Sequence, residues 1–533
     1  MEEQNIDKMP SETPETEPSP APAPAPKKNK FVGMLDGYFG ITKAGSSIKT
    51  EILAGLTTFM TMVYILLVNA GMFANIPGVS FGAMYITTAL AAIVGTLLMA
   101  FLAKLPFAQA PGMGLNAFFV FTVVAVFGGG YADFGFTYAN ALVIVLVSGI
   151  LFLCLTFGGV REKIVRAVPQ CVKVAIPAGI GLFIAFIGLQ NAGLVVANGS
   201  TLVQIVSLNV LNQSFAQLVP YIVTMLTFIA IAVLSKLKVK GAILWGILGG
   251  AVLFYILAVG VKDTPVTIGT ATYAGLLGKG SSYYIDVTLQ DPFQAFKDFG
   301  TQTVGKVFTE GFTGLFSVDG AFSFGKLLNF IAIFISFAMV DMFDTIGTLL
   351  GTATRANMLD ENGEVPNMRK ALLCDSIATC TGAILGTSTV TTFVESSAGV
   401  AEGGRTGLTS LMVALLFFVA MFLSPIAQLI PGCATAAALV YVGVLMMACV
   451  TNVDWHDPAC AVPAFLTVAM MAFTYNISYG IGLGFISYTL IKLCTGKIRR
   501  KKDENGNIVE EGIHPITAVL SVLFLLNFML VSH

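Results

Sequence analysis

The sequence predicts an all-α polytopic membrane protein with about fourteen transmembrane segments, arranged as inverted repeats in which two segments contain short strands. The first observation is composition: 56% of the 533 residues are hydrophobic, 11% are charged, and the mean hydropathy is +0.83. A soluble core of this length cannot bury so much apolar surface, so lipid must be the main solvent. The other two observations are the number of apolar windows and a pair of apolar segments that carry helix-breaking residues.

Apolar windows recur along the whole chain, and about twelve are long enough, or nearly so, to cross a bilayer as helices. They lie at 52–73, 84–105, 138–157, 172–195, 218–234, 242–261, 327–350, 372–385, 408–423, 436–450, 462–475 and 477–493. Two further apolar segments, PFAQAPGMGLNAFFVFTVVAVF from Pro106 and TSTVTTFVESSAGVAEG from Thr387, contain Pro, Gly or β-branched runs that interrupt a helix. Together these give about fourteen segments.

The charges in the loops predict which side each loop occupies, because cytoplasmic loops hold the Lys and Arg residues. Every second connection carries positive charge: Lys104; Arg161, Lys163, Arg166 and Lys173; Lys236, Lys238 and Lys240; Arg355, Arg369 and Lys370; Arg405; and the run 497–502. The opposite connections NIPGVSFG, GGGYADFG and 197–217 carry none, and NVDWHDPA is the one exception to the alternation. We therefore expect a multi-pass protein of the plasma (cell) membrane with a cytoplasmic N-terminus.

Three regions lie outside the fourteen segments. Residues 1–30 are rich in Pro, Glu, Ser and Ala and lack the apolar core of a signal peptide, so we expect a disordered cytoplasmic tail. Residues 262–325 are too long for a simple turn and predict a partly structured extracytoplasmic cap. The apolar stretch 516–531 is short, and the sequence leaves open whether it is a surface helix, a re-entrant piece or a further span.

Several chemistries find no support in the sequence. The eight cysteines lie mostly within or at the ends of apolar windows without a CxxC pair, and no histidine lies inside a clear window. GLLGKGSS lacks the spacing of a phosphate-binding loop, so nucleotide hydrolysis is not the expected energy source. We expect no metal, no cofactor, no catalytic residues and no nucleic acid partner.

Acidic residues inside apolar windows are the main functional signal. Asp341 and Asp344 lie three residues apart in one window, hence close together on a helix, while Asp375 lies in the next window and Glu395 follows TSTVTTFV. A charged side chain at bilayer depth costs about 2.5–3.5 kcal/mol on insertion scales, so a chain that keeps several of them is expected to use them. A water-filled vestibule or internal salt bridging is the alternative explanation. The acids predict a polar site inside the membrane.

Two interrupted segments, one in each half, locate that site. The Pro and Gly residues of 106–114 oppose a continuous helix there and leave Asn116 near the start of a half-helix. Residues 388–394 read as extended chain from their Thr and Val content, with Glu395 at the start of a short helix. A pair of interrupted apolar segments is the sequence pattern of an inverted-repeat secondary transporter with its site at the membrane midplane.

Long motifs in the same order resemble one known family. They are TEILAGLTTFMTMVYILLVNAGMF, LPFAQAPGMGLNAFF, DMFDTIGTLLGTATRANMLDENGEVPN, ALLCDSIATCTGAILGTSTVTTFVESSAGVAEGGRTGLTS and PAFLTVAMMAFTYNISYGIGLGFISY. The family is that of the adenine/guanine/hypoxanthine permeases, the AzgA-like branch of the nucleobase:cation symporter-2 family, and the resemblance covers about residues 31–495. It implies two inverted seven-segment repeats with short strands in segments 3 and 10, a core of segments 1–4 and 8–11, and a gate of segments 5–7 and 12–14.

The resemblance also implies domain limits and site residues. On this chain we expect the tail at 1–30, the core at 31–160 and 326–425, the gate at 161–261 and 426–495, the cap at 262–325, and a basic loop with a C-terminal apolar segment at 496–533. By the same resemblance Asp341, Asp344, Glu395 and Asn116 look like substrate-binding residues, and we add Phe107 at the first interruption. The proton-coupling candidates are Asp344, Asp375 and Glu395.

The expected function is secondary active import of purine nucleobases (adenine, guanine, hypoxanthine) by proton symport. Ionised carboxylates accept the N–H groups of a flat neutral base, an amide can both donate and accept, and no Lys or Arg falls in the central segments to neutralise an anion. Buried neighbouring carboxyl groups exchange protons near neutral pH. Sodium coupling, the preferred purine and a homodimer stay open. The alternatives are an anion transporter on a similar scaffold and an intramembrane enzyme such as a Mg-dependent prenyltransferase that uses DMFD.

Overall fold

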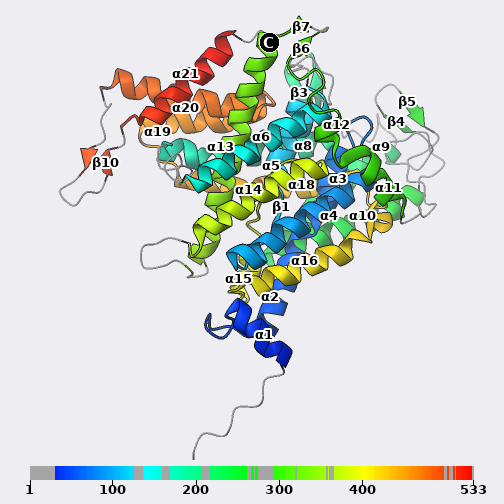
Figure 1. The fold of residues 1–533 in the computed structure, drawn as a ribbon. Helices are drawn as coiled ribbons and strands as arrows, with labels where there is room; N and C mark the ends of the chain where they lie inside the picture. Colours follow the sequence, from blue (N-terminus) through cyan, green and yellow to red (C-terminus); the bar gives the residue numbers. More distant parts are fainter. Residues whose placement is uncertain are drawn as a thin grey trace, which may run out of the picture.

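In the computed structural model the chain forms a bundle of long helices that surrounds a pair of short strands (Figure 1). The structure describes residues 30–124, 136–158, 168–206, 215–260, 266–268, 271–273, 293–318, 321–355, 358, 365–496, 501–502, 508–510 and 512–530. Residues 1–29 of the expected tail, part of the expected cap (262–265, 269–270, 274–292 and 319–320) and several of the loop cations lie outside these residues. Nine helices in the described part are long and apolar enough to cross a membrane.

The first half of the bundle follows the expected order of segments. Its elements are α2 (Ile48–Met62), α3 (Tyr64–Phe73), α4 (Phe81–Leu98) continued by η1 (Met99–Ala103), β1 (Gln109–Pro111), α5 (Met113–Ala117) continued by η2 (Phe118–Val123), α6 (Tyr138–Phe157), α8 (Gln170–Asn191), α9 (Phe215–Lys236) and α10 (Ala242–Gly260). Segment 1 consists of α2 and α3, and segment 3 consists of β1, α5 and η2. Segments 2 and 4–7 are single helical runs.

The second half repeats this order. Its elements are α13 (Phe324–Arg355), α14 (Met368–Leu385), β8 (Val390–Thr392), α15 (Ser396–Ala401), α16 (Gly407–Met421), α17 (Ser424–Ala427), α18 (Gly432–Met447) with η4 (Ala448–Asn452), α19 (Pro458–Phe473) and α20 (Ile477–Cys494). Segment 10 is a strand followed by a short helix, as segment 3 is. The expected fourteen segments are therefore all represented among the described residues.

Local sequence explains where the helices begin. Side chains of Ser47, Ser80, Thr137, Thr406, Asp457 and Asn476 accept hydrogen bonds from backbone N–H groups in the first turns of α2, α4, α6, α16, α19 and α20. Such caps satisfy N–H groups that have no partner within the helix. The strand–helix segments have no side-chain cap of this kind: α5 follows Gly112 and α15 follows Glu395.

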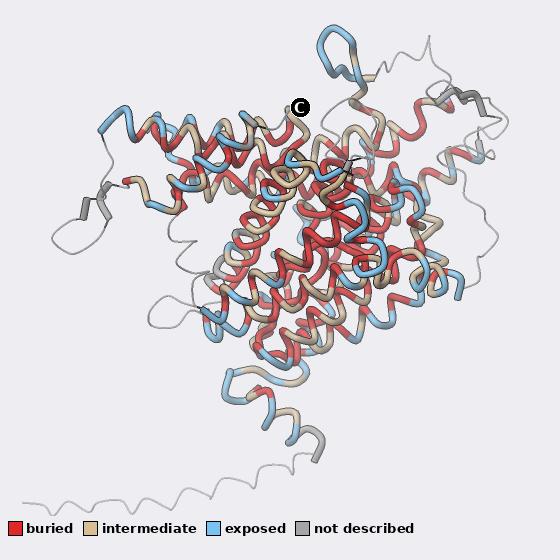
Figure 2. Tube along the Cα trace, turned by 45° about the horizontal axis from the view of Figure 1, so that its top comes forward, coloured by how far each residue is buried: buried red, intermediate tan, exposed pale blue. Residues whose placement is uncertain are grey.

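The helices form two packed groups. Segments 1–4 and 8–11 pack mainly on one another, through pairs such as α6 with α14 and α4 with α16, whereas segments 5–7 and 12–14 pack through α8 with α18 and α19, and α9 with α10. These groups are the core and the gate of the expected fold. Figure 2 shows buried residues concentrated inside the bundle, while large apolar side chains such as Trp245 and Ile256 of α10 are exposed on its outer surface.

Equivalent segments of the two halves meet in the centre. The strand pair joins segments 3 and 10, and the α8–α18 contact joins segments 5 and 12. Gly181 and Gly443 face each other in the second contact, and a Cβ on Gly181 would lie 2.7 Å from the carbonyl oxygen of Gly443. Small residues at such a crossing let two membrane helices approach closely. This pairing is what an inverted-repeat architecture requires.

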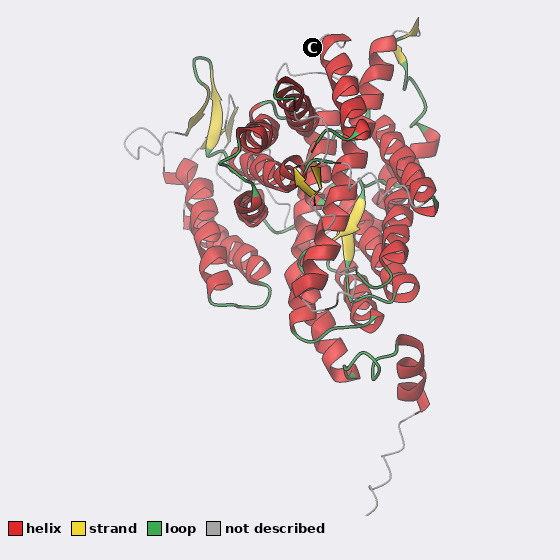
Figure 3. Ribbon diagram, turned by 90° about the vertical axis from the view of Figure 1, so that its left-hand side faces the viewer, coloured by secondary structure: helices red, strands yellow, loops and turns green. Residues whose placement is uncertain are grey.

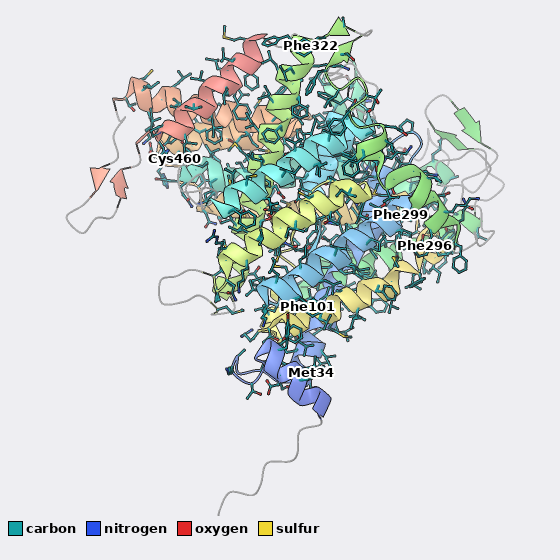
Figure 4. The ribbon with its side chains drawn as sticks, in the orientation of Figure 1. Met34, Phe101, Phe296, Phe299, Phe322 and Cys460 are labelled. Atoms are coloured by element: carbon teal, nitrogen blue, oxygen red, sulfur yellow. The ribbon has the colours of Figure 1, made fainter. Side chains whose placement is uncertain are left out.

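The remaining elements lie at the ends and edges of the bundle. They are α1 (Lys30–Phe39), the hairpins β2–β3 (Val195–Asn198, Leu202–Ile205), β4–β5 (Val266–Ile268, Ala271–Tyr273), β6–β7 (Ser317–Val318, Ala321–Phe322) and β9–β10 (Lys501–Lys502, Ile508–Glu510), and the short helices α11 (Gln294–Asp298), η3 (Phe299–Thr303) and α12 (Lys306–Thr309). Figure 4 shows Met34 of α1 and Phe101 at one end of the molecule and Phe322 at the opposite end. The Lys104 ammonium donates to the Tyr38 carbonyl, so α1 lies on the side of the loop cations.

The C-terminal apolar stretch forms one helix. It is α21 (Pro515–Leu530), which packs against α20 and α13 (Figure 1). Ser521 donates to the Phe485 carbonyl, and Phe524 lies against Phe485 and Gly482. The helix is therefore attached to the outside of segment 14, and the sequence had left its placement open.

Candidate functional site

The two interrupted segments meet as a short antiparallel strand pair. Register places Gln109 opposite Thr392, Ala110 opposite Thr391 and Pro111 opposite Val390. Backbone hydrogen bonds extend the pair at both ends, from Gly112 N–H to the Thr389 carbonyl at 3.1 Å and from Phe393 N–H to the Ala108 carbonyl at 3.0 Å. Figure 3 shows such short strands among the helices. The expected short strands in segments 3 and 10 are confirmed, and each interruption satisfies the other's backbone.

The pleat of the strands separates two faces. Gln109 and Val390 point towards α4, since a Cβ on Gly95 would lie about 3.0 Å from both side chains. Thr391 points the other way, and its hydroxyl donates a hydrogen bond of 3.2 Å to Asp344 Oδ2 on α13. Alternation along a strand therefore directs Thr391 to the acidic residues.

The three expected coupling acids gather beside this second face. Asp344 accepts from Thr391, Asp375 accepts a 2.5 Å hydrogen bond from the Thr345 hydroxyl, and Glu395 accepts a 2.7 Å hydrogen bond from the Tyr64 hydroxyl. Asp375 and Glu395 both lie within electrostatic range of Asp344. The structure thus brings the acids of segments 8, 9 and 10 into one cluster, and each acid has a hydroxyl donor.

Asn116 forms hydrogen bonds with both interrupted segments. Its Nδ2 donates to the Pro111 carbonyl at 3.2 Å, and its Oδ1 accepts a hydrogen bond from the Ser388 hydroxyl. Both side chains are fully buried. The amide therefore connects the half-helix after β1 with the segment that leads into β8. An amide is suited to this position because it can donate and accept at once.

Asp341 and Phe107 have different surroundings from the acid cluster. Asp341 is fully buried and lies within electrostatic range of the Cys380 thiol on α14. Phe107 is fully buried in an apolar cluster with Leu349, Leu372 and Val400. Both residues lie near the site in the chain, and these contacts place Asp341 beside α14 and Phe107 in apolar surroundings.

Positive charge is scarce around the strand pair. Residues 105–160, 327–354 and 371–404, which include every element of the site except Tyr64, contain no Lys or Arg. The ion pairs described are Lys240 with Glu402, at 2.9 Å, and Lys306 with Glu310, both in connections at the ends of the helices. The described part of the chain also holds no group of three His, Cys, Asp or Glu residues arranged to bind a metal ion. The site offers carboxylates, hydroxyls and amides in apolar surroundings.

The donors to Asp344 and Glu395 were not found from the sequence, whereas Thr345, the donor to Asp375, stands directly after Asp344 and was expected to add a hydroxyl to the acidic region. Tyr64 lies in the first apolar window and Thr391 in the β-branched run, and neither residue type is unusual there. The one available signal was the Thr content of the second interruption, which predicted a strand without predicting its partners.

A helical bundle that crosses the membrane many times and closes around two inverted broken segments with a polar centre is a membrane transporter. The chain belongs to the permease family, which matches residues 49–483. The resemblance inferred from the motifs is thereby confirmed, and an intramembrane enzyme is excluded.

Curated relatives cover nearly the whole chain. The chain is 39% identical to the guanine/hypoxanthine permease PbuO of Bacillus subtilis over 92% of its own length and 100% of that protein. It is 36% identical to the adenine permease AdeP of Escherichia coli over 94% of its length and 97% of that protein. Among solved structures, the transmembrane domain of the cyanobacterial bicarbonate transporter BicA aligns with a TM-score of 0.51 at 15% identity, over 82% of this chain and 97% of that one. That likeness supports the fold.

Proposed function

We propose that the protein imports purine nucleobases into the cell by proton symport. The observation that carries the proposal is the cluster of Asp344, Asp375 and Glu395 beside the strand pair, with hydroxyl donors and no Lys or Arg in the surrounding segments. Such a site suits a neutral ligand that offers N–H groups to carboxylates. The relatives named as guanine/hypoxanthine and adenine permeases support a purine as that ligand.

In this proposal Asp344 and Glu395 accept N–H groups of the base, since both carboxylates are only partly buried and flank the strand pair. Asn116 holds the half-helices in register and contributes its amide when the base is bound. Asp341, one helical turn before Asp344 on α13, and Phe107, two residues before β1, are fully buried and support the site through packing. Charge-assisted hydrogen bonds of this kind are roughly twice as strong as neutral ones, so the acids dominate recognition.

The proton enters the same cluster. Three carboxyl groups that interact electrostatically in apolar surroundings do not all carry a charge at once, so binding a proton and binding a neutral base are coupled there. We propose that Asp344, Asp375 or Glu395 holds the transported proton. Asp375 is fully buried and bonded to the Thr345 hydroxyl, which fits a relay, whereas the partly buried Asp344 and Glu395 fit direct contact with substrate.

The proposed membrane placement follows the loop charges. The core comprises 31–160 and 326–425 and the gate 161–261 and 426–495, with the N-terminus in the cytoplasm and the protein in the plasma membrane. Transport moves the core, which carries the acids, against the gate. An anion transporter on this fold would need positive charge at the strand pair, which the sequence there does not supply.

Uptake by purified protein in vesicles tests the proposal. Radiolabelled adenine, guanine and hypoxanthine are offered under an inward proton gradient, under an inward sodium gradient, and under neither. Concentrative uptake with the proton gradient alone is the expected result, and unlabelled purines should compete whereas bicarbonate and sulfate should not. Accumulation driven only by sodium would overturn the proton coupling. Uptake of an inorganic anion without purine uptake would overturn the substrate class.

A further inference from the structure

Segment 1 brings one tyrosine to the site. The helix α2 ends at Met62 and α3 begins at Tyr64, with Val63, itself in helical conformation, between them. The Thr61 hydroxyl donates to carbonyls of the preceding turn, at Thr57 and Thr58. Tyr64 follows this turn, and its side chain is fully buried. The first residue of α3 therefore lies inside the core.

The Tyr64 hydroxyl reaches the acid of segment 10. It donates to Glu395 Oε1 at 2.7 Å, although the two residues come from opposite halves of the chain. A phenol has one proton to donate, and a carboxylate has two oxygens with several acceptor positions. The contact therefore fixes the direction of the Glu395 carboxyl group and leaves acceptor capacity for a second donor.

We propose that Tyr64 is a positioning residue for substrate recognition: its hydroxyl orients Glu395 so that the carboxylate meets an N–H group of the bound base. The inference rests on the proposed function, because it takes Glu395 as a substrate ligand. A carboxylate without this donor would lose its fixed orientation and would have to be ordered on binding, which lowers affinity. Tyr64 acts through Glu395 and does not itself contact the base.

A second buried tyrosine provides a matched control. Tyr85 of α4 is also buried, and its hydroxyl donates to the backbone carbonyl of Ala420 at 3.0 Å, in a contact between α4 and α16. Replacement by Phe at either position removes one hydroxyl and one hydrogen bond from the core. Only the change at Tyr64 removes a hydrogen-bond donor from an acid of the site. A difference in purine affinity between the two variants therefore measures the effect of the Tyr64–Glu395 contact and not the loss of a buried hydroxyl in general.

The test is a double-mutant cycle on purine binding and uptake. Tyr64→Phe should raise the KM for purine about 10-fold with a maximal rate within about two-fold of wild type, because one hydrogen bond to a charged group is lost. Tyr85→Phe should leave KM unchanged. The second variant is Glu395→Asp, whose shorter side chain keeps the carboxylate but withdraws it from the Tyr64 hydroxyl; Glu395→Gln is not used because its amide oxygen can still accept from Tyr64. In the Glu395→Asp background, Tyr64→Phe should add less than about two-fold, since residues that act as one unit are not additive.

Two results would overturn the inference. One is a KM in Tyr64→Phe equal to that of wild type, and the other is an effect of Tyr64→Phe that is equally large with and without the Glu395 change. Thermal unfolding in detergent checks that each variant is folded, and Tyr64→His, which retains a ring donor, is used if Tyr64→Phe does not insert. Failure of the proposed function has a separate signature, since wild-type protein would then take up no purine.

Discussion

Thr391 of β8 donates a hydrogen bond to Asp344 of α13, and in the strand pair the same Thr391 lies opposite Ala110 of the other half. One residue thus connects the backbone pairing of the two interruptions with the acid cluster. The direction of the Asp344 carboxylate depends on strand register, because a shift by one residue would turn Thr391 to the other face. Several expectations follow from this linkage.

Asp344→Asn should leave the protein folded and inserted but reduce purine affinity by about 5- to 150-fold, the equivalent of about 1–3 kcal/mol for a mismatched buried group. The amide keeps the size of the side chain but places a donor where the base and Thr391 both need an acceptor. Asp341→Asn is the matched control and should be milder in affinity, since Asp341 lies towards Cys380. Equilibrium binding of labelled purine to both variants measures this. Wild-type affinity in both would place the bound base elsewhere.

Gly112→Ala should weaken purine binding about 10-fold by disturbing the Thr391–Asp344 contact. A Cβ at Gly112 would lie 3.0 Å from the Thr391 hydroxyl and 3.7 Å from Asp344 Oδ2, while its φ of −70° suits alanine. Gly71→Ala is the control, because a Cβ there has no neighbour within 4 Å. Competition binding with a purine series compares the two variants. An unchanged affinity in Gly112→Ala would show that the hydroxyl can move aside without consequence for the site.

Glu395→Gln should separate exchange from accumulation if Glu395 carries the coupled proton. The variant keeps the size of the side chain and one acceptor oxygen but cannot take up a proton. Purine exchange across a vesicle membrane should then persist, while accumulation driven by a pH gradient is lost. If Glu395 only binds the substrate, the variant should instead lose roughly 1–3 kcal/mol of purine binding free energy. Normal accumulation by this variant would direct the same test to Asp344 and Asp375.

A cross-link between residues 240 and 402 should block transport reversibly. Lys240 in the connection between the gate helices α9 and α10 forms a 2.9 Å ion pair with Glu402 at the end of α15 in the core. In Lys240→Cys with Glu402→Cys, a short bifunctional reagent that forms a disulfide with each thiol would tie core to gate, and a reductant, which cleaves both disulfides, should restore uptake. Lys306→Cys with Glu310→Cys is the control, since that pair lies within one helical turn. Full uptake after complete cross-linking would show that core and gate do not separate at this contact.

The architecture was predictable because its causes are local. Pro and Gly in 106–114 and the Thr and Val run of 388–394 oppose helix, and unpaired backbone inside a membrane must find protein partners. The register of the pair followed only from the structure. The acids were equally visible, because charge at bilayer depth is rare whatever the surrounding fold.

The contacts of the site were not predictable because they join residues distant in the chain. Tyr64 and Glu395 are in different halves, and nothing near Tyr64 in the sequence indicates a carboxylate partner. Asp341 and Asp344 were expected on one helical face, but residues three apart differ by about 60° around the axis. That rotation is enough to direct Asp344 to Thr391 and Asp341 towards α14.

The pairing of β1 with β8 also constrains how the protein is made. During synthesis β1 emerges with the first half, and its hydrogen-bonding partners are not yet translated. Until β8 is made, the peptide groups of β1 have no hydrogen-bonding partner. Inserting them into hydrocarbon would cost several kcal/mol of free energy for each unsatisfied group. The first half therefore cannot complete its own fold, and the transporter assembles only when the ribosome has delivered segment 10. A chain divided in the 262–325 region should work only when both pieces are produced in the same cell.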